Sequence, residues 1–164
     1  MTEVTVGEQA DFTQFDLFFI GGGQDFEQEV LLSDLKAGKG SEIKAAIADG
    51  KTFLTICGGY QMLGRHISDP EQVEAAGVTE IDGMGLLPLE TVFHGEKVQT
   101  QTNGVFSGVA GLLSELNGKR YAGYEIHMGR SEEKMPALAG EGNVYGSYVH
   151  GIFDAPGIAD TILK

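Results

Sequence analysis

The sequence contains only one cysteine, Cys57, and no run of about 20 apolar residues that would cross a bilayer as a helix. A single cysteine cannot form an internal disulfide, which fits a protein from a reducing compartment. The N-terminus also lacks the basic and then apolar pattern of a secretory signal. We therefore expect a cytoplasmic protein that does not insert into a membrane.

Positive charge is scarce as well. Lysine and arginine total 11 against 24 aspartate and glutamate residues, which gives a formal net charge of −13. This balance argues against a nucleic-acid partner, because the phosphate backbone is itself anionic. There is no G-x-x-x-x-G-K-S/T loop for ATP, and Cys57 and the four histidines lack the paired spacing of a zinc site. We expect neither a metal nor a cofactor.

The length of 164 residues, with 41% hydrophobic residues, suits one globular domain that covers 1–164. The N-terminal part alternates strand and helix patterns, which predicts a parallel sheet with helices packed on it. We expect one helix to begin with Ser41 as its cap and to stop at Gly50. The expected strands are 3–6, 16–20 and one ending at residue 56, and the expected helices are 25–35, 41–50 and 59–65.

The second half has a different pattern, with strands separated by glycine turns. These expected strands are 84–93, 97–102, 119–127 and 143–150, and a last helix begins near Pro156. The predicted fold class is therefore α/β, with an open, mainly parallel sheet flanked by helices and with antiparallel additions in the second half.

Cys57 ends an apolar, β-branched run and is followed at once by Gly58 and Gly59 and then by a helix-compatible stretch. This order is typical of a nucleophile elbow, a tight strand-to-helix turn that raises one side chain above the edge of a sheet. The glycines relieve crowding in that turn, and the helix N-terminus favours the nucleophilic thiolate. A small buried hydrophobe is the commoner role of a free cysteine, but a plain core position would not need two glycines.

A thiol nucleophile needs a base, and the chain offers His66, His94, His127 and His150. His150 ends an apolar strand, and ligands of an open α/β sheet bind at the carboxyl ends of strands, where Cys57 also lies. We therefore choose His150 as the partner of Cys57, although a structural role is commoner for a histidine at a strand end. We expect His66 and His94 to be exposed, at a helix end and in a turn respectively.

Three glycines, at 21–23, follow the expected strand 16–20. The N–H groups of such a turn are suited to binding phosphate or to stabilising an oxyanion beside Cys57. Most glycine turns are only turns, so this signal is weak by itself.

The segment 56–64, ICGGYQMLG, resembles the nucleophile motif of class I glutamine amidotransferases, in the branch of cobyric acid synthase and of the lipid II isoglutaminyl synthase amidotransferase subunit. The segment 148–153, YVHGIF, is similar to the histidine motif of that branch, and the resemblance extends from about residue 11 to the end. It implies a flavodoxin-like fold. It also implies an enzyme that attacks the amide of L-glutamine with a cysteine, forms a thioester and passes ammonia to an ATP-dependent synthetase or ligase.

The resemblance implies that Cys57 is the nucleophile and that His150 is the general acid and base. It implies four further site residues, two for an oxyanion hole and two for binding the substrate: Gly23 and Gly58 through their N–H groups, and Gln61 and Gly22. Many class I members carry a glutamate two residues after the histidine, where this chain has Ile152. Because this branch is known for lacking that acid, a Cys–His dyad, or some other group that orients the histidine, is expected.

The acceptor of the ammonia is the point on which the motifs differ. Residues 19–28 resemble the lipid II subunit, whereas 85–93 and 123–130 resemble cobyric acid synthase, which normally carries a synthetase domain upstream on the same chain. Because the chain has no such domain, and lacks the family's usual first strand, our main interpretation is lipid II (peptidoglycan) amidation with a separate ligase. The alternative is the glutaminase domain of cobyric acid synthase in cobalamin biosynthesis.

Two further interpretations keep the same fold. One is a cysteine peptidase or hydrolase of the related superfamily, against which Gln61 argues. The other belongs to a different class, a catalytically inactive binding module, and is motivated by the missing first strand and the missing acid.

Overall fold

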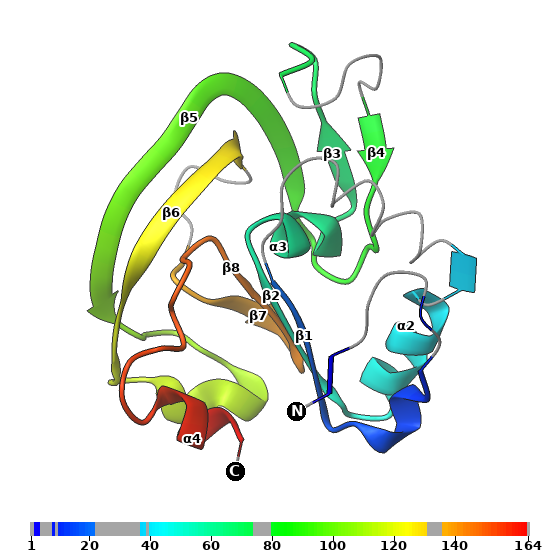
Figure 1. Cartoon of the computed structure of the whole chain (residues 1–164), viewed down its shortest axis with the longest axis vertical. Helices are drawn as coiled ribbons and strands as arrows, with labels where there is room; N and C mark the ends of the chain where they lie inside the picture. The colour runs from blue at the N-terminus through cyan, green and yellow to red at the C-terminus, as the bar shows by residue number, and fades with distance from the viewer. Residues whose placement is uncertain are drawn as a thin grey trace.

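The computed structural model describes residues 2–3, 8, 10–21, 37–38, 40–73, 80–130 and 136–163, and these form two four-stranded sheets with short helices around them (Figure 1). The expected strand 3–6, apart from its first residue, and the expected helix 25–35 lie outside the described residues, as do Gly22 and Gly23.

The first sheet has the mainly parallel arrangement that the alternating pattern predicts. β1, β2 and β8 run parallel, and β7 is antiparallel to β8 at one side. The strand order is β1 (Leu17–Ile20), β2 (Thr52–Ile56), β8 (Val144–Ser147) and β7 (Ala139–Glu141).

β2 is the central strand on which the site depends. Its side chains alternate between two core clusters, with Phe53 in one and Leu54 and Ile56 in the other. The four residues from Phe53 to Ile56 are all buried. A continuous apolar run is what a parallel strand covered on both faces requires, so the sequence pattern and the packing agree.

Helices pack against this sheet, and one of them forms a hydrogen bond with the residue before β8. α2 (Gly40–Ala48) buries Ile43 and Ala46, and the side-chain amide of Asn143, just before β8, donates to the carbonyl oxygens of Ile47 and Lys51 at the end of this helix. α2 begins one residue earlier than expected, so Ser41 lies in its first turn and not at the capping position. Further helices among the described residues are the 3-10 turns η1 (Phe12–Gln14) and η3 (Gly111–Leu116), α3 (Gly58–Leu63) and α4 (Ile158–Ile162).

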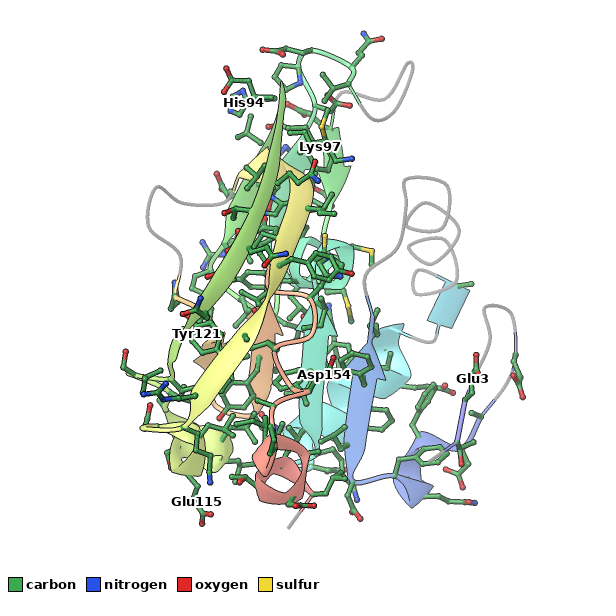
Figure 2. All side chains as sticks on the ribbon, turned by 60° about the vertical axis from the view of Figure 1, so that its left-hand side comes forward. Glu3, His94, Lys97, Glu115, Tyr121 and Asp154 are labelled. Carbon is green, nitrogen blue, oxygen red and sulfur yellow. The ribbon has the colours of Figure 1, made fainter. Side chains whose placement is uncertain are left out.

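The second sheet is dominated by a long antiparallel hairpin of β5 and β6. Figure 1 shows the hairpin arching beside the first sheet, and Figure 2 places His94 and Lys97 at one end of it and Tyr121 toward the other. The order is β4 (Glu80–Asp82), β3 (His66–Ser68), β5 (Glu90–Val105) and β6 (Arg120–Arg130).

This sheet differs from the expected pattern in two ways. The glycine break at 95 does not end a strand, because β5 runs through it with a register shift between Phe93 and Val98. The first part of the expected strand 84–93 is not a strand, because its N–H groups serve the end of α3 instead: Met84 donates to the Met62 carbonyl at 2.7 Å and Leu86 to the Leu63 carbonyl at 2.8 Å.

Two local expectations in this part of the chain are also corrected. α3 ends at Leu63, so His66 does not sit at a helix end but opens β3, where its side chain is 34% exposed. His94 is exposed as expected, but it lies within β5 and not in a turn.

Candidate active site

Cys57 occupies the strand-to-helix turn between β2 and α3. Its backbone has φ 52° and ψ −111°, and this positive φ lies in the range that side chains of L-residues rarely adopt. The Cys57 N–H donates to the carbonyl oxygen of Ser147 at 2.8 Å, and the Gln61 N–H donates to the Cys57 carbonyl at 3.0 Å. The surrounding structure therefore holds the cysteine in a strained backbone conformation, as in a nucleophile elbow.

Close packing accounts for glycine after the elbow. A Cβ atom on Gly59 would lie 3.0 Å from Ile20 Cγ2 and 3.2 Å from the Ile20 carbonyl oxygen. The start of α3 therefore lies tightly against the end of β1, an approach that suits only a residue without a side chain. Gly58 is buried as the first residue of α3.

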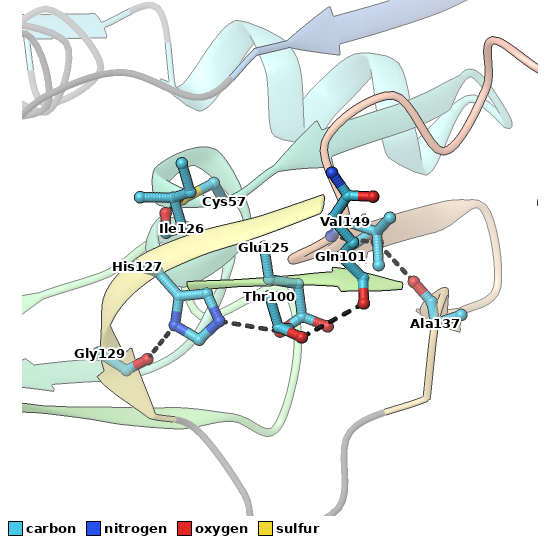
Figure 3. Close-up of polar contacts among 10 residues, drawn as sticks. Cys57, Thr100, Gln101, Glu125, Ile126, His127, Gly129, Ala137 and Val149 are labelled. Carbon is cyan, nitrogen blue, oxygen red and sulfur yellow. Dashed lines mark hydrogen bonds and ion pairs between the residues drawn. The ribbon is translucent and has the colours of Figure 1, made fainter. Parts of the chain in front are cut away.

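The Cys57 side chain is buried beneath β6. Only 7% of its surface is exposed, and its Sγ–H donates to the carbonyl oxygen of Ile126 at 3.6 Å. Figure 3 shows Cys57 and Ile126 together, with His127 and Glu125 on the same strand nearby. A strand from the second sheet thus passes over the elbow of the first.

His150 follows β8 and lies at the same sheet edge as Cys57. β2 and β8 are parallel neighbours whose last residues, Ile56 and Ser147, are register partners. The chain therefore leaves both strands at one edge, with Cys57 immediately after β2 and His150 three residues after β8. Ligands bind at this edge in open α/β sheets.

The position of His150 is fixed by Tyr124 of β6. The two residues form an antiparallel bridge in which the His150 N–H donates to the Tyr124 carbonyl at 2.8 Å and the Tyr124 N–H donates to the His150 carbonyl at 3.1 Å. Their rings are stacked, with centroids 5.1 Å apart and planes 7° from parallel. The same strand, β6, therefore contacts both Cys57 and His150.

The electrostatic surroundings favour a neutral His150. Burial lowers the pKa of His150 below its usual value of 6.5, and the nearby charge of His127 lowers it further. A neutral imidazole at neutral pH is the form that accepts a proton from a thiol.

His127 is held by polar groups on both sides of its ring. Nδ1 lies 2.7 Å from the Gly129 carbonyl oxygen, and Nε2 lies 3.1 Å from Oε2 of Glu125 (Figure 3). The ring also stacks on Tyr148, with centroids 4.0 Å apart. Both ring nitrogens therefore have an oxygen atom within hydrogen-bonding distance, and the orientation of the ring is fixed.

Gln61 lies on α3 one turn after Cys57 and is 2% exposed. A Cβ atom on Gly129 of β6 would come within 2.5 Å of the Gln61 side-chain nitrogen. The Gln61 amide is therefore packed directly against the strand that covers the elbow. The other residue expected to bind substrate, Gly22, lies outside the described residues, as does Gly23.

Sequence reasoning did not predict that β6 contacts both Cys57 and His150. Tyr124 and the Ile126 carbonyl belong to the segment 123–130, which the resemblance singled out without assigning a role. Contact between this segment and the elbow depends on the path of the hairpin, which no local pattern encodes.

Within the described part of the chain, no three His, Cys, Asp or Glu side chains are grouped closely enough to hold a metal ion. None of the helices in the described residues has the length and apolar character to span a membrane. The expected cytoplasmic location stays a prediction.

These features define an α/β domain with a cysteine elbow at the carboxyl edge of a parallel sheet. The family model described as the CobB/CobQ-like glutamine amidotransferase domain matches residues 2–158. The chain belongs to this family of enzyme domains.

Its relatives include the cobyric acid synthase of Lachnoclostridium phytofermentans, which is 44% identical over 161 residues that cover 80% of this chain and 31% of the relative. The cobyric acid synthase of Ruminiclostridium cellulolyticum is 45% identical over 131 residues, which cover 68% of this chain and 25% of the relative. The chain thus spans less than a third of the length of these relatives.

A solved structure of a glutamine amidotransferase superposes with a TM-score of 0.56, covering 90% of this chain and 76% of that one. The sequence identity is 14%, so this likeness is one of fold. It agrees with the predicted fold class.

Proposed function

We propose that this domain hydrolyses L-glutamine through a thioester on Cys57 and supplies ammonia to an ATP-dependent synthetase. The observation that carries the proposal is the shared sheet edge, where a strained cysteine elbow and His150 leave neighbouring strands. Membership of the glutamine amidotransferase family supports the same chemistry.

In the proposed reaction, the Cys57 thiol gives its proton to His150, and Sγ attacks the side-chain amide carbon of glutamine. Backbone N–H groups, for which we propose Gly58 and Gly23, stabilise the charge that develops on the amide oxygen. His150 then protonates the leaving nitrogen, and ammonia departs from the thioester. Water, deprotonated by His150, attacks the thioester and releases glutamate and the free thiol.

Gln61 and Gly22 are the residues that we propose for binding the substrate. The Gln61 amide is buried and packs from α3 against β6, so its position is set before glutamine binds. A side-chain amide offers both a donor and an acceptor, which matches the α-carboxylate and α-amino groups of glutamine.

For the acceptor, we propose the reaction of cobyric acid synthase, in which a synthetase region consumes the ammonia during cobalamin biosynthesis. The two relatives at 44% and 45% identity are cobyric acid synthases, and this favours the alternative interpretation of the sequence over lipid II amidation. The preference for lipid II rested on the absence of a synthetase domain. The absence of a synthetase domain from these residues does not argue for a separate ligase, because the chain matches less than a third of each relative.

The test is glutamate release from L-glutamine by the purified chain, alone and with a cobyric acid synthase synthetase region added. We expect release that requires both Cys57 and His150, so Cys57→Ala and His150→Ala each abolish it. A diazoketone analogue of glutamine should label Cys57 of the wild type, as seen by mass spectrometry. Absence of both release and labelling with the synthetase region present would instead support an inactive binding module.

A further inference from the structure

We propose that Tyr124 is a positioning residue for His150, and that its ring and backbone fix the imidazole where many class I enzymes use a carboxylate. This inference rests on the proposed glutaminase function and assigns a residue that the resemblance left without a role. It is carried by the contacts of His150, by the packing of Gly123 and by the residue that occupies the usual position of the acid.

The usual position of the acid is closed to that role. Ile152, two residues after His150, is fully buried at 0% exposure and belongs to the apolar cluster that contains Leu54 and Val149. No carboxylate among the described residues hydrogen-bonds to the His150 ring, and Asp154 beyond it is exposed. Among the described residues, the imidazole is therefore oriented by contacts other than a carboxylate.

Tyr124 supplies those contacts in two ways. The exchange of both main-chain hydrogen bonds, at 2.8 and 3.1 Å, fixes the backbone of His150 against β6. The stacked phenol ring, 7° from parallel at 5.1 Å, covers one face of the imidazole and restricts its rotation. Tyr124 itself is 48% exposed, so its ring is not needed to fill the core.

The chain around this pair is adapted to the close approach. A Cβ atom on Gly123 would collide with the His150 carbonyl oxygen and lie 2.7 Å from Val149 Cγ1. Gly151, on the other side of His150, has φ +77°, which turns the chain away after the bridge. A glycine at each position therefore allows Tyr124 and His150 to meet.

The same strand also locates the nucleophile. The carbonyl oxygens that accept from His150 and Cys57 belong to Tyr124 and Ile126, two residues apart on β6. Two residues of a strand rise by about 7 Å, so β6 sets a short spacing between the histidine backbone and the thiol. A shift of Tyr124 would change the distance between base and nucleophile, and displacements of about 1 Å cost on the order of a hundredfold in rate.

The experiment compares Tyr124→Phe, Tyr124→Leu and Tyr124→Ala with the wild type in glutamine hydrolysis by the full chain. We expect Tyr124→Phe to retain activity because it keeps the ring. Loss of the ring in the Leu and Ala variants should lower kcat by about tenfold to a hundredfold, with KM for glutamine nearly unchanged. Gln101→Ala is the matched control, because this exposed residue is the register partner of Tyr124 across the hairpin and its side chain carries no aromatic ring.

The pH profile separates positioning from a general loss of structure. Among the described residues, the charged groups to consider are His127, which acts on His150 directly, its partner Glu125 on β6, and Asp154 beside Gly151. With these unchanged, removal of the Tyr124 ring exposes the imidazole, so the acidic limb of kcat/KM should move toward pH 6.5. A purely structural role would lower activity without moving this limb.

A second readout does not depend on activity. In the wild type, the ring current of Tyr124 should shift the NMR signals of the His150 ring protons upfield, and Tyr124→Leu should remove that shift. If the wild type is active and the Leu and Ala variants match it in kcat and pH profile, the positioning role is wrong while the proposed function stands. If the wild type neither hydrolyses glutamine nor labels at Cys57, the proposed function fails, and the NMR comparison still tests the ring contact.

Discussion

The amide N–H of Cys57 donates to the carbonyl oxygen of Ser147 at 2.8 Å, and this bond joins the end of the cysteine strand to the end of the histidine strand. It continues the parallel ladder between β2 and β8 by one step beyond the register pair Ile56–Ser147. Because the bond involves only backbone atoms, it survives substitution of the cysteine side chain. The elbow should therefore keep its geometry in variants that have lost the nucleophile.

Strain at the elbow should be measurable by comparing Cys57→Gly with Cys57→Ala. Glycine normally destabilises relative to alanine, but a backbone at φ 52° and ψ −111° strains a residue that carries a Cβ atom by about 1–3 kcal/mol. We expect Cys57→Gly to be more stable than Cys57→Ala by about 1 kcal/mol in urea unfolding. Both variants lack the thiol, so the difference reports the backbone alone.

The control for this comparison is Ala45→Gly, at an exposed position in α2. There the usual order should hold, with glycine less stable by about 1 kcal/mol. A Cys57→Ala variant more stable than Cys57→Gly would contradict the strained elbow.

Gly129→Ala should impair the binding of glutamine. The added Cβ would come within 2.5 Å of the Gln61 side-chain nitrogen and 2.7 Å from atoms of Phe93 and Thr91. Because strand backbone moves less readily than a side chain, we expect Gln61 to be displaced and KM for glutamine to rise by about tenfold, equivalent to about 1.4 kcal/mol. Steady-state kinetics of glutamate release provide the measurement.

Gly95→Ala is the matched control for a glycine in the same hairpin. Its Cβ would meet Glu71 Oε2 at 3.4 Å and Val73 Cγ1 at 3.9 Å, which are ordinary contacts. We expect its KM to equal that of the wild type. An equal KM in Gly129→Ala would argue against Gln61 as a residue that binds substrate.

The lowered pKa of His150 should make stability depend on pH. The pKa of the ring lies below 6.5 in the folded chain, because of burial and then of the charge on His127, and near 6.5 in the unfolded chain. As pH falls through 6.5, the unfolded chain binds this proton first, so the contribution of neutral His150 to stability is present above pH 6.5 and is lost below it. Urea unfolding between pH 5 and 8 should show a lower free energy of unfolding on the acidic side.

His150→Gln should reduce that slope, because glutamine does not titrate. His94→Gln, which removes an exposed ring in β5, should leave the His150 contribution in place. An identical slope in wild type and His150→Gln would show that other groups cause the pH dependence.

Ser147 should stabilise the turn that leads from β8 to His150. Its hydroxyl is buried, donates to the Ala137 carbonyl oxygen and accepts from the Val149 N–H at 3.0 Å. Ser147→Ala leaves both partners without this hydroxyl, and we expect the free energy of unfolding to fall by about 1–3 kcal/mol.

Thr100→Ala removes a hydroxyl that is exposed and donates to the Gln101 carbonyl at 3.2 Å. As the control for Ser147→Ala, it should change the free energy of unfolding by less than about 0.5 kcal/mol. Equal effects of the two substitutions in urea unfolding would show that burial of the Ser147 hydroxyl contributes nothing.

Local patterns predicted the strands β1, β2 and β8 of the first sheet but not the short strand β7. The run 17–20 is apolar and the run 52–56 is apolar and β-branched, and they end at glycine and cysteine, so the strand character of both and their parallel pairing follow from adjacent residues. The second sheet was less predictable. β3 and β4 are three residues each, too short to show a period, and the glycine at 95 is a bulge that a pattern cannot distinguish from a turn.

The sequence by itself determined the elbow at Cys57, the place of His150 at the same sheet edge and the fold class, because each depends on residue types that are adjacent in the chain. Only the tertiary structure decided that β6 passes over the elbow, that Tyr124 stacks on His150 and that the Ile126 carbonyl accepts from the thiol. These contacts join residues 26 and 69 positions apart. Their geometry depends on the twist of the hairpin and the packing of glycines at 123 and 129, which no single segment specifies.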